Sequence, residues 1–134
     1  MASKKKLKEA TLEALLERAS QSKNDQIQYK DYESEALEMT LKVKKIPARK
    51  FAVLSDGLGG DSLAEEFDKE VELIYECVPM FHSKELQDAY ECAEPTDVVM
   101  KVFDENVGEL ERMITFLLDL YGLGEAQQIE DLKN

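Results

Sequence analysis

The stretch 55–66, SDGLGGDSLAEE, gathers three glycines, acidic side chains and a hydroxyl, and so invites a test for ligand chemistry. A phosphate loop needs a Lys-Ser/Thr pair after its glycines, and the dinucleotide pattern needs glycine where Ser62 stands. A calcium loop that begins at Asp56 would place the apolar Leu58 at a ligand position. Ser62 and Glu65, three residues apart, match a helix-capping box instead. We therefore predict a linker over 55–61 and a helix that starts at Ser62.

Cys77, His82 and Cys92 are the other candidates for chemistry. Structural zinc takes four ligands, usually with close cysteine pairs, and this set has neither. A Cys–His nucleophile pair would need a third orienting group and an oxyanion loop, and neither is evident. The many carboxylates are expected on solvated helix faces, where they make poor general acids. The sequence thus predicts a non-enzymatic protein with reduced thiols, no cofactor and no metal.

The charge of this 134-residue chain is −12 and is unevenly distributed. Residues 1–50 carry a net +4 and residues 51–134 a net −16. The acidic part would repel nucleic acid and anionic membranes, and no run approaches the roughly 18 apolar residues of a membrane helix. The basic run KVKKIPARK (42–50) could contact phosphate, or dock on the acidic part of this chain or of another copy. We predict no nucleic-acid and no membrane partner, and a cytosolic chain without a signal peptide, because Glu9, Glu13 and Glu17 interrupt the first apolar stretch.

The N-terminal third predicts a helix followed by a β element. Residues 1–9 form a basic tail, leucines at helical spacing predict a helix over 10–20, and 21–25 is a polar break. Alternating apolar and polar residues predict strands over 26–32 and 37–44, which we expect to pair as a hairpin. Pro47 ends the second strand, and 48–54 can form a helical turn.

The rest of the chain predicts helices. The strongest runs from 63 to 78, with its acidic residues mostly off the apolar face, and Pro79 ends it. A second helix runs from Ser83 to Pro95. We interpret 96–103 as a short helix capped by Thr96 rather than as a strand. The last helix spans 110–121, with Gly122 as its left-handed cap. Residues 123–134 form a polar tail. The predicted fold is a single mainly α domain over 1–134: a small orthogonal array of four to five helices (core 62–122) with a short β element within 10–54.

Several segments resemble the phage tail assembly chaperones, in particular the XkdN-like group. The matching pieces are SKELQDAY (83–90), EPTDVVMKVF (94–103), LLDLYGL (117–123), IEDLKN (129–134) and the basic join LKVKKIPARKFAVL (41–54). The resemblance covers about two-thirds of the chain and excludes residues 1–36. It implies a non-enzymatic protein of the infected host cytoplasm, absent from the mature virion, that coats the tape-measure protein and recruits tail-tube subunits. The family offers no catalytic residues.

A partner groove is the site that this resemblance suggests. We expect it between the 63–78 and 110–121 helices, with Phe67, Tyr75, Met113 and Tyr121 at its edge; the alternative is that all four are core residues. The rival function is an acidic adaptor or inhibitor that binds a basic protein one-to-one. Self-association is a further expectation, because the basic and acidic segments could pair between copies.

Overall fold

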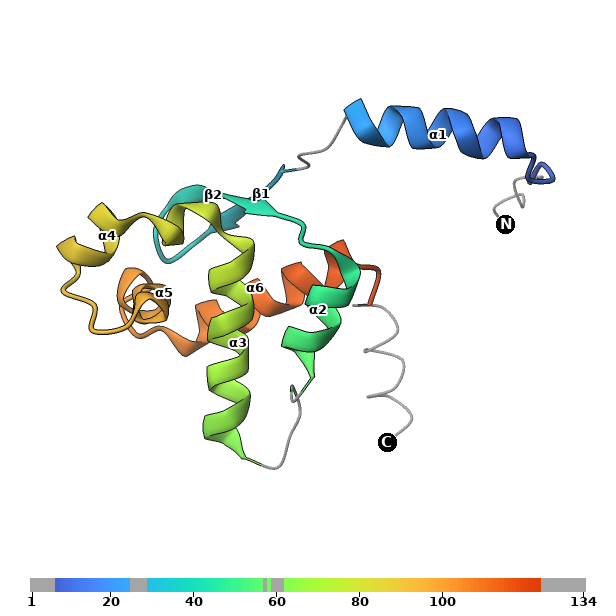
Figure 1. Cartoon of the computed structure of the whole chain (residues 1–134). Coiled ribbons are helices and arrows are strands. Elements are labelled where there is room, and N and C mark those ends of the chain that lie inside the picture. Colours follow the sequence, from blue (N-terminus) through green and yellow to red (C-terminus); the bar gives the residue numbers. More distant parts are fainter. Residues whose placement is uncertain (1–6, 25–28, 57, 59–61, 124–134) are drawn as a thin grey trace.

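The computed structural model describes residues 7–24, 29–56, 58 and 62–123 (Figure 1). Over these residues the chain is mainly helical, with one antiparallel two-stranded hairpin, so the predicted fold class is confirmed. Helix α1 (Leu12–Asn24) stands apart from a body made of the hairpin and the helices that follow it. Parts of the predicted tails and linker (1–6, 57, 59–61 and 124–134) lie outside the described residues.

The predicted hairpin forms, but its first strand extends to Ser34 and its second begins at Met39; residues 25–28, which include the predicted start of the first strand, lie outside the described residues. Strands β1 (Tyr29–Ser34) and β2 (Met39–Lys44) pair antiparallel, with Tyr32 opposite Leu41. Alternation turns Tyr32, Leu41 and Val43 inward and leaves the charged residues outside, because successive side chains point to opposite faces. Glu38 closes the turn with a φ of 53°.

Helices α2 (Ala48–Ser55) and α3 (Leu63–Cys77) follow the hairpin. Pro47 lies just before α2, which is a full helix where the sequence predicted only a turn. The Oγ of Ser62 accepts a hydrogen bond from the backbone N–H of Glu65 at 3.3 Å, so Ser62 caps α3 as predicted. The reciprocal bond of a full capping box is missing among the described residues. Helix α3 ends before Pro79, also as predicted.

A run of short helices connects α3 to the last helix. The 3₁₀ helix η1 (Pro79–His82) leads into α4 (Lys84–Ala89), which is capped by Ser83. The predicted extension of this helix to Pro95 is wrong, because α4 ends at Ala89. A second 3₁₀ helix, η2 (Pro95–Asp97), precedes α5 (Val98–Val102). The helical interpretation of 96–103 is therefore right, but the predicted N-cap is wrong. Thr96 lies inside η2, where the Asp97 side chain accepts from the Glu94 backbone N–H at 3.0 Å.

The last helix, α6 (Val107–Leu120), starts three residues earlier than predicted. The Asn106 side chain accepts from the backbone N–H of Glu109 at 3.0 Å and so fixes this start. At the other end Gly122 has a φ of 76°, as its predicted cap role requires. The N–H groups of Gly122 and Leu123 bond the carbonyls of Asp119 and Leu118, which completes a Schellman motif.

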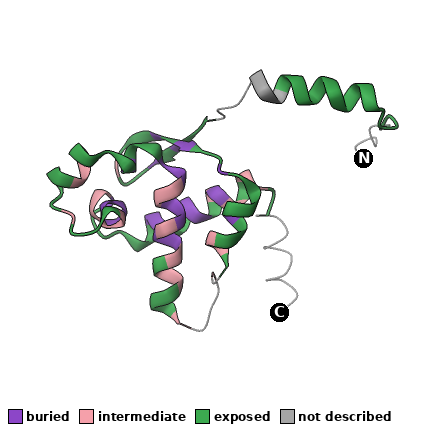
Figure 2. Cartoon of the chain, in the orientation of Figure 1, coloured by how far each residue is buried: buried purple, intermediate pink, exposed green. Residues whose placement is uncertain are grey.

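The core lies where α6 crosses α3, with the hairpin and α5 packed around them. Figure 2 shows the buried positions on the inner sides of these two helices. The fully buried large side chains of the core include Leu73, Ile74, Phe81, Phe103, Leu110, Met113 and Leu117. Phe81 and Phe103 meet edge-to-face at 5.9 Å between ring centroids, which ties η1 to the end of α5.

Helix α1 contributes nothing to this core. Its described side chains are all exposed, and Figure 2 shows this part of the helix in the colour of exposed residues. The predicted polar break over 21–25 is wrong for 21–24, which continue the helix. Polar residues there do not end the helix, because the described part of α1 has no contacts with the core that would fix the position of its end.

Candidate binding groove

A cavity of about 680 Å³ opens between α3 and the η2–α5 segment. Its apolar surface comes from both sides: Phe67, Val71 and Tyr75 from α3, and Pro95 and Met100 from the facing segment. The three α3 residues are spaced four apart, so they form one row along the helix. Val71 and Met100 are buried at the bottom, whereas Phe67 and Tyr75 are half-buried. The cavity is thus a groove with an apolar floor about two helical turns long.

The rim of this groove is strongly acidic. Six carboxylates and a single ammonium group line it: Asp68, Glu72, Glu76, Glu94, Asp97, Glu105 and Lys101. Lys50 pairs with Glu76 at 3.0 Å and Lys69 with Glu72 at 3.9 Å, and Lys101 donates to the backbone carbonyls of Tyr90 and Glu91. These contacts leave most of the negative charge without a partner of opposite sign in the described residues. The groove therefore favours an apolar ligand that carries positive charge.

Tyr75 is held in place by its neighbours. Its ring stacks on His82 with 4.3 Å between centroids, and His82 Nε2 lies 2.8 Å from the Tyr75 carbonyl oxygen. Gln87 Nε2 donates to the Tyr75 hydroxyl at 3.4 Å and to the Phe81 carbonyl at 2.8 Å. His82 thus supports one wall of the groove.

The structure brings together two of the four residues predicted for a groove. Phe67 and Tyr75 line the groove, but on the face of α3 that faces α5 and not α6. Met113 is fully buried where α3 packs on α6, so no groove edge exists at that position. The sequence missed Val71 and Met100. Val71 could have been found, since it lies midway in the four-residue row between Phe67 and Tyr75.

Tyr121 lies elsewhere, at the end of α6. Its hydroxyl donates to the Ile46 carbonyl at 2.6 Å and accepts from the Ile46 N–H at 2.7 Å. Its ring stacks on Phe51 at 3.8 Å, with the Lys45 ammonium 5.1 Å from the ring centroid. Burial raises the pKa of the Tyr121 hydroxyl, as does the nearby Cys77. Tyr121 therefore joins α6 to the β2–α2 connection.

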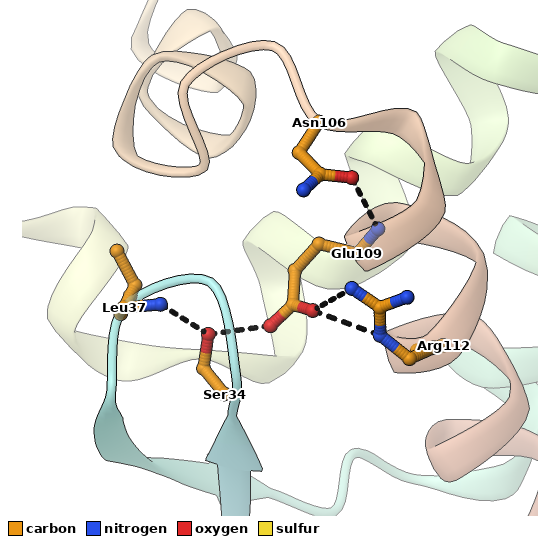
Figure 3. Close-up of polar contacts among 5 residues, drawn as sticks. All are labelled: Ser34, Leu37, Asn106, Glu109 and Arg112. Atoms are coloured by element: carbon orange, nitrogen blue, oxygen red, sulfur yellow. Dashed lines mark hydrogen bonds and ion pairs between the residues drawn. The ribbon is translucent and has the colours of Figure 1, made fainter.

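Glu109 is the most enclosed charged group in the described chain. Figure 3 shows its carboxylate between the Ser34 hydroxyl, which donates to Oε1, and the Arg112 guanidinium, which donates to Oε2 at 2.7 and 3.1 Å. Burial would raise the pKa of Glu109, but these hydrogen bonds and the positive charge of Arg112 outweigh it and hold the pKa low. Burial and the same carboxylate raise the pKa of Tyr32 to about 12. The network fastens the hairpin to α6.

Glu70 is the second buried carboxyl, at 4% exposure. Burial raises its pKa to about 7, with added repulsion and hydrogen bonding from Glu111 and repulsion from Glu66. The expectation that the acidic residues of the helices are solvated is therefore wrong for Glu70 and Glu109. Both lie in line with the apolar stripes of their helices: Glu70 is four residues before Ile74, and Glu109 four before Met113.

Of the candidates for chemistry, Cys77 lies in the core and His82 stacks on Tyr75. Cys77 is buried, and that burial, with the Glu76 carboxylate nearby, raises its pKa to about 12 against the opposing charge of Lys50. A thiol held protonated in this way is a poor nucleophile. No group of three or more metal-ligating side chains occurs within the residues that the structure describes.

Comparison with known proteins gave no match: no protein-family model, no curated protein and no solved structure matches this chain. Within the described ranges, no helix is both long enough and apolar enough to cross a membrane.

Proposed function

We propose that this chain is a non-enzymatic binding protein whose α3–α5 groove takes a helical partner segment with an apolar stripe and basic flanks. The observation that carries the proposal is the apolar floor of Phe67, Val71 and Met100 beneath a rim of six carboxylates. An amphipathic helix laid in a groove is a recurrent mode of recognition, and the rim would select for positive charge on it.

In keeping with the resemblance to tail assembly chaperones, the partner we propose is the tape-measure protein of a phage tail. A long helical protein exposes apolar stripes before the tail tube encloses it, and exposed stripes of that extent promote aggregation. Many acidic copies along it would cover these stripes and keep the assembly soluble by charge. The copies would then recruit tail-tube subunits in the host cytoplasm and leave before the virion matures.

The acidic rim equally suits the alternative, an adaptor or inhibitor of one basic protein. Stoichiometry separates the two, because a chaperone that coats its partner binds in many copies, whereas an inhibitor binds one-to-one. The deciding experiment is co-expression with the longest coiled-coil protein encoded just downstream, as the candidate tape-measure protein, followed by size exclusion with mass determination. Co-elution of a soluble complex with many copies supports the chaperone. An insoluble tape-measure protein and a chain that elutes alone would refute it.

A charge-reversal pair tests the groove itself. Asp68→Lys with Glu72→Lys alters the rim, and Glu85→Lys with Asp88→Lys on α4 makes the same change of net charge outside the groove. We expect the rim variant to lose partner binding by more than about tenfold while the α4 variant retains it, since charge complementarity acts locally at physiological salt. Both variants should unfold at similar temperatures, because all four side chains are at least partly exposed. Equal binding by the two would count against the groove.

A further inference from the structure

Helix α1 carries an apolar stripe that the body does not cover. Leu12, Leu15 and Leu16 are 73%, 56% and 59% exposed, and their spacing places them on one side of the helix. Thr11 caps the start of the helix, its Oγ accepting from the Ala14 N–H at 3.1 Å. Such a helix is marginal in water without a packing partner, since helices of this length depend on tertiary contacts.

The groove matches this stripe in length and chemistry. Leu12 to Ala19 spans about 10 Å along the α1 axis, and Phe67 to Tyr75 spans about 12 Å along α3, at about 1.5 Å per residue. Residues 1–24 carry a net charge of +3, with four lysines between positions 4 and 8. Leucines would meet the apolar floor while the lysines meet the carboxylate rim.

The position of α1 favours a groove on another molecule. Asn24 and Tyr29 are joined by five Cα steps, which reach at most about 18 Å even when fully extended. Figure 1 shows α1 beyond the β1 end of the hairpin, whereas α5, one wall of the groove, lies on the opposite side of the body. A reciprocal exchange between two copies would occupy both grooves and close as a two-fold dimer.

We propose that residues 1–24 of one copy dock in the α3–α5 groove of a second copy, leucines on the floor and lysines toward the rim. The exchange protects the groove until a partner helix displaces the N-terminal segment. The proposal concerns the same groove as the proposed function, but its test needs only this chain. Its failure would therefore leave the binding of a tape-measure protein undecided, and the reverse also holds.

The test measures the mass of the full chain in solution and uses two kinds of variant. Leu15→Asp with Leu16→Asp disables the stripe, and Asp68→Lys with Glu72→Lys disables the groove. Ala14→Asp with Gln21→Asp is the matched control, because it adds the same two charges to the opposite face of α1. We expect wild type and control to be dimers that weaken with salt, and each disabled variant to dimerise more than about tenfold more weakly.

Mixing the two disabled variants gives the sharpest result. The stripe variant keeps its groove and the groove variant keeps its stripe, so we expect the mixture to form a heterodimer through one intact contact. A groove variant that dimerises as wild type does would overturn the proposal in favour of pairing between two α1 helices. A wild type that is monomeric at all concentrations and salt levels would overturn it as well.

Discussion

The buried carboxyl of Glu70 makes the stability of this protein depend on pH in a direction opposite to that of most acidic side chains. In the folded chain its pKa is about 7, well above the ordinary 4.5, because burial and then the negative charge of Glu111 disfavour the ionised form. The folded state therefore binds a proton that the unfolded state releases. The stabilising effect of this proton is fully present below about pH 4.5 and is lost as the pH rises through 7.

The magnitude follows from the two pKa values. Each pKa unit is worth about 1.4 kcal/mol, so full ionisation of a dry carboxyl would cost about 3 kcal/mol. Solvent near the exposed Glu111 screens part of this repulsion. We therefore expect ionisation of Glu70 to lower the free energy of unfolding by about 2 kcal/mol. Glu70→Gln keeps the shape of the side chain without the charge. The variant should therefore gain about 2 kcal/mol over wild type above pH 8 and show little gain near pH 4.

Urea unfolding from pH 4 to pH 9 measures this difference directly. The difference in unfolding free energy between Glu70→Gln and wild type should rise between about pH 5 and pH 7.5 and then level off. Glu85→Gln on the exposed start of α4 is the control and should follow wild type at every pH. A constant difference between Glu70→Gln and wild type across the range would refute the reasoning.

Three substitutions test the contacts that hold α6. Glu109→Ala should cost about 3 kcal/mol in urea unfolding at neutral pH, because it strands a buried hydroxyl and opens a cavity; a loss under about 1 kcal/mol would contradict the network in Figure 3. Tyr121→Phe keeps the ring stack but loses both backbone hydrogen bonds, and should lower the unfolding free energy by about 1–2 kcal/mol; no change would mean that water replaces them. Gly122→Ala should cost about 1 kcal/mol at the left-handed cap, and unchanged thermal unfolding would rule out strain there.

The regular elements could be predicted because local chemistry alone determines them. The alternation over 37–44 predicted the second strand of the hairpin, and the side-chain cap at Ser62 and the left-handed cap at Gly122 appeared where their residue types predicted. Boundaries were less accurate where a cap was overlooked, as at Asn106, whose side chain starts α6 earlier than the apolar pattern suggests. The pattern of apolar residues identifies a helix, but the capping residue decides where it begins.

The buried carboxyls and the position of the groove could not be predicted with the same certainty. Whether Glu70 is buried depends on α6 crossing α3 at that level, which is a property of the packing and not of α3 alone. The sequence also identified α6 as the far wall of the groove, because both helices are strongly amphipathic. In the structure the apolar face of α6 packs in the core, with Met113 and Leu117 fully buried.

Helix α3 carries more apolar surface than one neighbour can cover, and this explains where the groove lies. Leu73, Ile74 and Cys77 face the core, whereas the row from Phe67 to Tyr75 continues the apolar arc around the helix toward α5. Helix α5 has only five residues, so it covers the bottom of that row at Met100 and leaves the two aromatic side chains half-exposed. The floor at Val71 and Met100 is part of the core, but none of the six rim carboxylates is, so the groove can change its charge without disturbing the packing that holds α6. A binding surface built in this way can diversify while the fold stays the same.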